Sequence, residues 1–185
     1  MFAIRRSIEI DAGHRVPGHA GKCKNLHGHR YRFEALVAGS ARPDGMVLDF
    51  GFLKDLMVEC VDAPFDHGLV IWEGDPLLGA LLGYPEGGRQ MDGSLLWIAT
   101  FGAEEAVAVE EVRAYAREHD VWMGRGSFGK VAVIKSPPTA EHLAEIAWRL
   151  MAPRIHERSD GLATLVSVTV RETPNCSATW PGGAA

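Results

Sequence analysis

The chain has 185 residues, 46% of them hydrophobic and 23% charged, with a formal net charge of −5 when histidine is neutral. This length and apolar content predict one globular domain with a hydrophobic core and exclude a disordered or collagen-like chain. The acidic balance argues against a nucleic-acid partner, and without a membrane-spanning apolar run or an apolar signal segment we expect a cytoplasmic protein with no membrane partner.

Two segments near the start alternate apolar and polar residues with a period of two, which is typical of half-buried strands. In residues 2–14 the even positions are mostly apolar, and in residues 27–37 the odd positions are. We expect these strands to pair antiparallel. The loop between them, residues 13–26, contains Pro17 and several glycines, as irregular functional loops do.

Charge is concentrated in this first part of the chain. Residues 1–32 hold seven basic and two acidic residues, a local charge of +5. A local positive field beside glycines suits a small polyanion such as a phosphorylated metabolite. An ordinary solvated strand face explains the same charges, and the pattern alone leaves both interpretations open.

Two helices are predicted from caps and apolar stripes. Asp49 is a candidate N-cap for a helix over residues 50–61 that ends by Pro64. Thr139 is the candidate N-cap of a second helix, which we expect to stop at Pro153.

The remaining segments complete an α+β pattern. A helix rich in Ala and Glu is expected near residues 103–119, and a strand at Val131–Ile134. Val166, Val168 and Val170 predict a third core strand that continues to Glu172, and residues 176–180 a short fourth. The order of elements predicts a single domain over residues 1–185, with an antiparallel sheet and two helices on one face.

Three histidines extend the apolar faces of the first two strands. An antiparallel pairing brings His14 close to His27 and His29, and the last two point the same way because they are two residues apart on a strand. Three converging neutral imidazoles are the ligand set of a catalytic zinc site with an open fourth position. A closed structural zinc site, with Cys23 or His19 as fourth ligand, is the alternative.

The cupin barrel is a second alternative for the same histidines. Its first metal motif fits the spacing from Gly21 through His27 and His29 to Glu34. Its second motif needs a further histidine, and Leu48 stands in that place. The two predicted helices also fit poorly in an all-strand barrel.

The three cysteines, Cys23, Cys60 and Cys176, are an odd number, which favours reduced thiols over a disulfide framework. Cys23 lies between Lys22 and Lys24, and neighbouring positive charge favours its thiolate. Cys60 lies on the apolar stripe of its helix and is expected to be buried. The role of Cys176 stays open.

Two carboxylates are further candidates for the site. Asp66 and His67 have the composition of a relay in which the acid fixes the tautomer while the histidine moves a proton, although adjacent Asp and His also occur by chance. Glu172 ends an apolar strand face, where it can accept two hydrogen bonds from a planar ring with adjacent N–H and NH₂ donors. A strand-end acid reaching water is the simpler interpretation.

Six motifs in order resemble the family of 6-pyruvoyl-tetrahydropterin and 6-carboxy-tetrahydropterin synthases. They are residues 12–16 (AGHRV), 23–29 (CKNLHGH), 45–50 (GMVLDF), 66–67 (DH), 138–141 (PTAE) and 170–173 (VRET). The resemblance implies the tunnelling fold, or T-fold, in which sheets from several subunits join into a barrel. It also implies a homohexamer, a dimer of trimers, that acts on dihydroneopterin triphosphate.

The same resemblance assigns roles to residues. It implies that His14, His27 and His29 bind Zn²⁺. Cys23 would be the proton-transferring thiol, with Asp66 and His67 completing the relay. Glu172 would anchor the pterin, with Thr139 and Glu141 near its pocket, and the local charge of +5 would meet the triphosphate.

Within the family, the three residues between Cys23 and His27, together with Leu26, favour the 6-carboxy enzymes of the queuosine and deazapurine route. The expected reaction converts dihydroneopterin triphosphate to 6-carboxytetrahydropterin, acetaldehyde and triphosphate. A 6-pyruvoyl synthase that eliminates triphosphate is the alternative on the same fold. A non-catalytic, zinc-stabilised pterin-binding or interaction protein is the third hypothesis.

The chain departs from the family pattern chiefly between its two halves. An insertion at about residues 72–130 replaces a short link, and His142 stands where Asn is expected. Ala106, Val109, Val112 and Ala116 recur at helical spacing, so we expect the insertion to form its own helix and strand.

Overall fold

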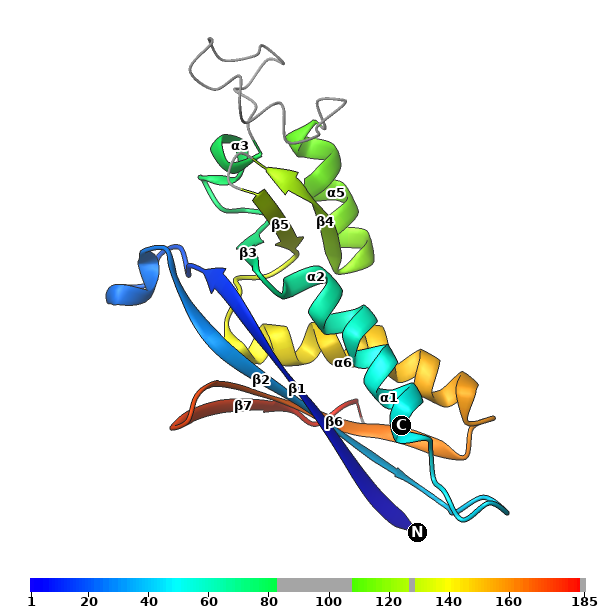
Figure 1. The fold of residues 1–185 in the computed structure, drawn as a ribbon. Coiled ribbons are helices and arrows are strands. Elements are labelled where there is room, and N and C mark those ends of the chain that lie inside the picture. Colours follow the sequence, from blue (N-terminus) through cyan, green and yellow to red (C-terminus); the bar gives the residue numbers. More distant parts are fainter. Residues whose placement is uncertain (83–107, 127–128, 184–185) are drawn as a thin grey trace. The chain divides into compact units, whose positions relative to one another are not determined.

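The computed structural model describes residues 1–82, 108–126 and 129–183. Its strands are β1 (Phe2–His14), β2 (His27–Gly39), β3 (Gly68–Trp72), β4 (Val121–Gly126), β5 (Gly129–Ile134), β6 (Ala163–Thr173) and β7 (Cys176–Trp180) (Figure 1). In the sheet, neighbouring strands are hydrogen-bonded in the order β4-β5-β3-β1-β2-β6-β7. Its helical segments are η1 (Lys22–Lys24), α1 (Phe50–Met57), η2 (Val58–Asp62), α2 (Ala63–Phe65), α3 (Leu78–Leu81), α5 (Val109–His119) and α6 (Ala140–Arg158).

The chain divides into two compact units, and β1 and β2 each contribute residues to both. The first unit holds residues 1–11, 29–66 and 139–185, and the second holds residues 12–28 and 67–138.

In the first unit, β2 pairs antiparallel with β6, and β6 with β7. The helices α1 and α6 lie on one face of these strands, as the sequence predicted (Figure 1). The odd positions of β2 from Tyr31 to Gly39 are buried, which confirms the period-two alternation. The predicted α+β class is therefore confirmed.

The helix after Asp49 begins as predicted but ends later. The Asp49 side chain accepts hydrogen bonds from the backbone N–H groups of Gly51 and Phe52. The chain stays helical through η2, a π-helical segment, and through α2, which contains Pro64 and ends at Phe65.

The prediction that the second helix stops at Pro153 is wrong, because α6 continues to Arg158 with the proline inside it. Proline in a helix interior loses one backbone hydrogen bond. The turn beyond it places Ile155 in the core with no exposed surface. Burial of that side chain stabilises the last turn and offsets the lost bond.

The second unit contains most of the inserted segment and has its own core. β3 pairs parallel with the end of β1 and with β5, while β4 pairs antiparallel with β5. A hydrophobic cluster joins these strands to α3 and α5, and it consists of Ile71, Leu78, Leu81, Leu82, Val112, Ala116, Val131 and Val133. The described part of the insertion thus forms a helix and strands of its own, as predicted. Residues 83–107, including Ala106, lie outside the described residues.

Two details of the sheet differ from expectation. The sheet is mixed rather than antiparallel, because helical segments connect β2 to β3 and β3 to β4 and allow parallel pairing. Val166 is 38% exposed rather than in the core. The register between β2 and β6 shifts beside it, which leaves Val166 as the extra residue of a β-bulge and turns its side chain outward.

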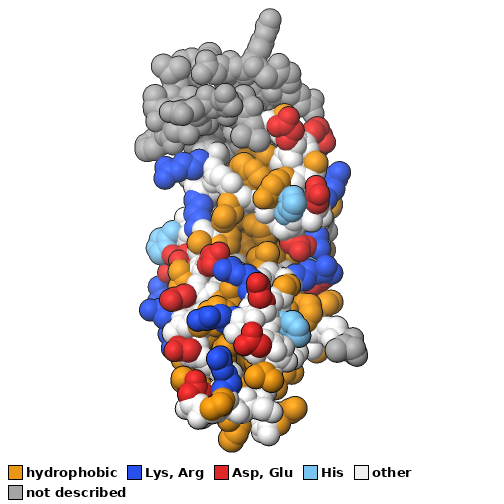
Figure 2. Space-filling view, turned by 90° about the vertical axis from the view of Figure 1, so that its right-hand side faces the viewer, with side chains coloured by type: hydrophobic (Ala, Val, Ile, Leu, Met, Phe, Trp, Pro, Cys, Tyr) orange, Lys and Arg blue, Asp and Glu red, His pale blue; other side chains and the backbone are white. Residues whose placement is uncertain are grey.

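The surface carries both signs of charge. On the face drawn in Figure 2, acidic and basic side chains are interspersed over the described residues. Within residues 1–82, 108–126 and 129–183, no helix is both long and apolar enough to cross a membrane.

Candidate metal centre and active site

His14 is the last residue of β1 and is 2% exposed. Its Nδ1 lies 2.7 Å from the carbonyl oxygen of Pro138. A carbonyl can only accept, so Nδ1 carries a proton, and in the neutral form of the ring the lone pair is on Nε2. Pro138 immediately precedes Thr139, the N-cap of α6, so a carbonyl distant in sequence orients this ring.

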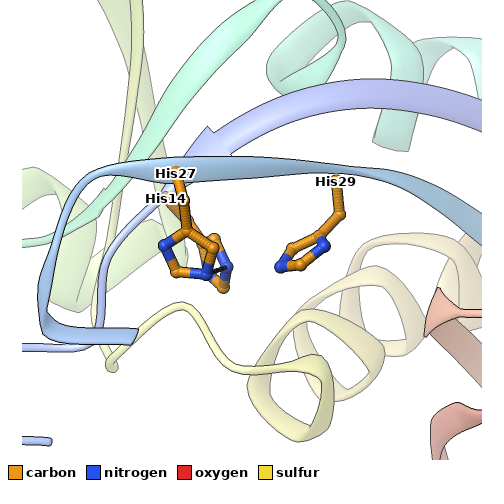
Figure 3. A group of neighbouring side chains, drawn as sticks. All are labelled: His14, His27 and His29. Carbon is orange, nitrogen blue, oxygen red and sulfur yellow. Dashed lines mark hydrogen bonds between the residues drawn. The ribbon is translucent and has the colours of Figure 1, made fainter. Parts of the chain in front are cut away.

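His27 begins β2 and is oriented in the same way. Its Nδ1 lies 2.8 Å from the carbonyl oxygen of Asn25, so Nδ1 donates there and the lone pair of the neutral form is on Nε2. The Nε2 atoms of His14 and His27 face each other at 3.1 Å (Figure 3). At this distance either a proton on one Nε2 or a metal ion must lie between the two nitrogens.

His29 completes the group from the same strand (Figure 3). The candidate ligand atoms of the three histidines all lie within 4.8 Å of one another. The His29 ring packs edge-on against Tyr31, with ring centroids 5.6 Å apart. The predicted convergence of His14, His27 and His29 is therefore observed.

The spacing of His14 and His27 suits a zinc ion. Imidazole nitrogens bind Zn²⁺ at about 2.0–2.1 Å, and a tetrahedron of that size has edges of about 3.3 Å. The 3.1 Å separation of the two Nε2 atoms is close to that edge. Hydrogen bonds from the opposite ring nitrogens to backbone carbonyls are the usual support of histidine ligands.

The described residues do not add a sulfur ligand to this group. Cys23, Cys60 and Cys176 are all described and free, and none belongs to the group of candidate ligands. His19 is also outside it, and its Nδ1 accepts a hydrogen bond from the Gly21 N–H. The observed donor set is the open three-histidine arrangement rather than a closed one.

Gly28 separates two of the histidines at a close approach of β1 and β2. A Cβ atom built on Gly28 would lie 2.9 Å from the carbonyl oxygen of Ala12. A side chain there would push the strands apart and move the histidines on either side. In the sequence, the signal for this role of Gly28 is its position between two candidate ligands, and no prediction used it.

Cys23 lies in η1 and is half-buried. Its carbonyl oxygen accepts a hydrogen bond of 2.8 Å from the Val16 N–H, which closes the loop after His14. Cys60 is 5% exposed, as predicted, and burial raises the pKa of its thiol. Its environment suits an inert structural cysteine.

Asp66 and His67 follow α2. One carboxylate oxygen of Asp66 accepts a hydrogen bond of 2.8 Å from the Asp11 N–H. His67 is exposed and has a φ of 51°, in the left-handed region that non-glycine residues rarely adopt. Strained backbone of this kind is often found at functional sites. The relay between Asp66 and His67 stays a prediction.

Glu172 lies beside one of the histidines. The register of β6 and β7 shifts at this residue, so Glu172 is at a bulge. Its Oε1 is 3.7 Å from the Nε2 of His29, and its side chain is 28% exposed. Bulges commonly re-aim side chains near functional sites.

Thr139 and Glu141 form the start of α6. The Thr139 side chain makes no capping bond to the helix backbone, although Thr139 is the N-cap residue as predicted. A hydrogen bond from Thr139 to the Glu141 carboxylate, assisted by a backbone N–H, lowers the pKa of Glu141. The two predicted residues therefore act as one hydrogen-bonded pair.

The fold matches solved T-fold structures. An uncharacterized protein from Wolinella succinogenes superposes with a TM-score of 0.67 at 20% identity and covers 98% of both chains. The 6-pyruvoyl tetrahydropterin synthase of Caenorhabditis elegans superposes with a TM-score of 0.56 at 19% identity, over 98% of this chain and 96% of that one. The architecture and the three-histidine group thus define a T-fold protein with a candidate metal centre.

Sequence comparison identifies the family. The family model described as 6-pyruvoyl tetrahydropterin synthase matches residues 3–182. The 6-carboxy-5,6,7,8-tetrahydropterin synthase of Rickettsia bellii is 31% identical over 177 residues, which are 95% of this chain and 97% of that protein. The same-named protein of Rickettsia felis is 46% identical over 80 residues, 43% of this chain and 58% of its own length. The chain belongs to the 6-pyruvoyl tetrahydropterin synthase family, and the cupin alternative is wrong.

Proposed function

We propose that the protein is a zinc-dependent 6-carboxy-5,6,7,8-tetrahydropterin synthase. The substrate would be 7,8-dihydroneopterin triphosphate, which takes up one water and yields 6-carboxytetrahydropterin, acetaldehyde and triphosphate. The observation that carries the proposal is the pair of facing Nε2 atoms of His14 and His27, with both Nδ1 atoms held by carbonyls. The names of the two Rickettsia relatives support the choice of product.

When bound, zinc would polarise the hydroxyl groups of the substrate side chain and acidify the adjoining C–H bonds. The three histidines would hold the ion and leave a coordination position for the substrate. The Nδ1 contacts of His14 and His27 support this role because they orient the two rings with Nε2 toward the site.

Proton transfer would fall to Cys23 and His67. We propose Cys23 as the thiol that removes a proton, and His67, oriented by Asp66, as the group that returns one. The half-buried position of Cys23 and the left-handed backbone of His67 support these roles.

Substrate binding would fall to the carboxylates and to the basic N-terminal segment. Glu172 would accept two hydrogen bonds from the pterin ring, and Thr139 with Glu141 would line the pterin pocket. The lowered pKa of Glu141 supports an ionised acceptor at that position. The net positive charge of residues 1–32 would attract the triphosphate.

A turnover experiment tests the proposal. The zinc-loaded protein is incubated with dihydroneopterin triphosphate, and the products are identified by mass spectrometry. We expect 6-carboxytetrahydropterin and acetaldehyde. A pyruvoyl product would assign the chain to the alternative synthase, and unchanged substrate would favour the non-catalytic pterin-binding alternative.

A Cys23→Ala variant separates catalysis from structure. The proposal predicts that this variant keeps its zinc and loses turnover. A closed structural site with sulfur as a ligand predicts loss of zinc and of folded protein instead.

We also propose a homohexamer in the cytoplasm that serves the queuosine and deazapurine route. Light scattering is expected to give six times the mass of one chain. A monomer at the concentrations used for turnover would contradict the proposed assembly.

A further inference from the structure

A buried acidic residue in the inserted segment is paired with the residue that follows a candidate zinc ligand. Asp75 lies just after β3 and has no exposed surface. One of its carboxylate oxygens accepts a hydrogen bond of 2.8 Å from the Leu77 N–H. The other lies 3.1 Å from the Nε of Arg15, whose side chain is 19% exposed.

The pairing of Arg15 with Asp75 depends on charge more than on hydrogen-bond alignment. Among the described residues, neither the Arg15 Nε nor the Asp75 Oδ2 makes a hydrogen bond of regular geometry. A buried carboxylate is strongly destabilising unless an opposite charge lies beside it. Asp75 therefore restrains the arginine, and with it the backbone that carries the arginine.

That backbone lies between two parts of the proposed site. Arg15 directly follows His14, and the next residue, Val16, donates its N–H to the carbonyl of Cys23. A restraint on Arg15 thus acts on the direction in which the chain leaves His14 and on the loop that carries Cys23. Every residue of this arrangement lies in the second unit.

The segment that carries Asp75 is itself held by α5. The Arg113 Nε donates to the carbonyl oxygen of Glu73 at 2.9 Å, and the Arg117 Nη2 donates to the Glu73 carboxylate at 2.8 Å. Glu73 is 7% exposed. The insertion thus supplies both the acid that pairs with Arg15 and the helix that holds Glu73, two residues before that acid.

We propose that Asp75 is a positioning residue that acts through Arg15 to hold His14 in its metal-binding orientation. The inserted segment then has a defined role, which is to stiffen the metal centre from outside the ligand set. The inference rests on the proposed zinc site. Supporting residues of this kind typically change metal affinity by about 10- to 100-fold when they are replaced.

The test uses Asp75→Asn, which keeps an oxygen for the Leu77 N–H and removes the charge that faces Arg15. Zinc binding to the metal-free protein is measured by calorimetric competition, and the coordination geometry is read from the visible absorption of bound Co²⁺. We expect zinc affinity to fall about 10- to 100-fold and the Co²⁺ absorption to change in shape.

A matched control is Asp120→Asn. Asp120 is 19% exposed in its side chain, pairs with Lys135 in the same unit, and has no contact with Arg15 or His14 in the described structure. Its backbone has a φ of 70°, which Asn tolerates well. We expect this control to keep wild-type zinc affinity and the wild-type Co²⁺ spectrum.

Arg15→Gln and the Arg15→Gln/Asp75→Asn double variant complete the test. If the two residues act as one unit, the losses in zinc affinity are not additive, and Arg15→Lys keeps more affinity than Arg15→Gln. Should Asp75→Asn fail to fold, the comparison of Arg15→Gln with Arg15→Lys decides the question.

The outcomes separate the two proposals. A wild-type protein that binds no zinc overturns the proposed function. If the wild-type protein binds zinc and the Asp75→Asn and Arg15→Gln variants match its zinc affinity and its Co²⁺ spectrum, only the positioning role is overturned. Equal losses in Asp75→Asn and Asp120→Asn would also overturn it, because they would reflect general destabilisation.

Discussion

Gly28 shows how one residue without a side chain controls the geometry of two candidate ligands. It lies between His27 and His29, where β2 passes close to the backbone of β1. The alternation of the strand sets the side on which the histidines lie, but the glycine sets how closely the strands approach. The spacing of the residues predicts the side on which the histidines lie, but it does not predict how closely the two strands approach.

Gly28→Ala is expected to weaken zinc binding. The new methyl group would meet the Ala12 carbonyl at 2.9 Å, and such overpacking typically costs about 1–3 kcal/mol of stability. We expect a loss of zinc affinity of about 10-fold or more, comparable to the loss of a supporting contact. Calorimetric titration with zinc and urea unfolding measure the two effects.

Gly13→Ala is the matched control on β1. A Cβ atom there would find its nearest neighbours at 3.6 Å, which is ordinary contact. This variant is expected to stay within about 0.5 kcal/mol of the parent. Equal effects of the two substitutions would show that the strand approach at Gly28 is not what orients the histidines.

The Thr139–Glu141 pair predicts a pH dependence. The pKa of Glu141 in the folded protein lies below its ordinary value of 4.5. The pair therefore adds stability above about pH 4.5, and that stability is lost as the pH falls through the folded pKa. Because Glu141 is an exposed residue, we expect the contribution to be about 0.5 kcal/mol.

Thr139→Val removes the hydroxyl and is expected to raise the pKa of Glu141 toward its ordinary value. Carboxyl NMR titration measures this change directly, and urea unfolding should show the lost stability at pH 7 but not at about pH 2. Thr139→Ser, which keeps the hydroxyl, should behave as the parent. An unchanged pKa in Thr139→Val would contradict the assigned hydrogen bond.

At the scale of elements, α6 is the clearest case in which packing overrides a local signal. Pro153 is a helix-ending residue by sequence, yet the helix continues for another turn because Ile155 is buried. The bulge at Val166 is a similar case, since alternation predicts its side chain on the wrong face. Strand and helix identities are local properties, whereas their ends and irregularities depend on neighbouring elements.

Pro153→Ala is expected to stabilise the protein. Proline in a helix interior lowers the free energy of unfolding by about 3 kcal/mol. Because proline also restricts the unfolded chain, it raises that free energy by about 1 kcal/mol at most. We expect a gain of about 1–2 kcal/mol in the free energy of unfolding, measured in urea. Pro174→Ala, at an exposed position between β6 and β7, should give no such gain. A loss of stability in Pro153→Ala would mean that the helix is built around the proline ring.

At the scale of the whole molecule, the proposed zinc site predicts a link between metal binding and folding. A ligand that binds only the folded chain adds stability in proportion to the logarithm of its concentration. With free zinc at 100 times its dissociation constant, we expect a gain of about 2.7 kcal/mol and a higher midpoint of thermal unfolding. His27→Ala should show no zinc-dependent gain, and an unchanged parent midpoint after chelation would contradict the metal centre.

The sequence by itself determined the positions of β1, β2 and β6 and the side on which the histidines lie, because alternation along a strand is a local property of the backbone. It did not predict β3. The three histidine positions were predictable from this alternation, whereas the cap at Asp49 and the helix in the insertion were predictable from capping chemistry and helical spacing. The parallel pairing of β3 and the course of α6 past Pro153 were not. Both depend on contacts between segments that are far apart in the chain.

Only the tertiary structure decided what supports the site. The carbonyl that orients His14 comes from Pro138, 124 residues along the chain, and the carboxylate beside Arg15 comes from a segment after β3. A backbone carbonyl carries no signature in the sequence, since every residue has one. Its effect on a metal ligand arises when folding brings it within hydrogen-bonding distance.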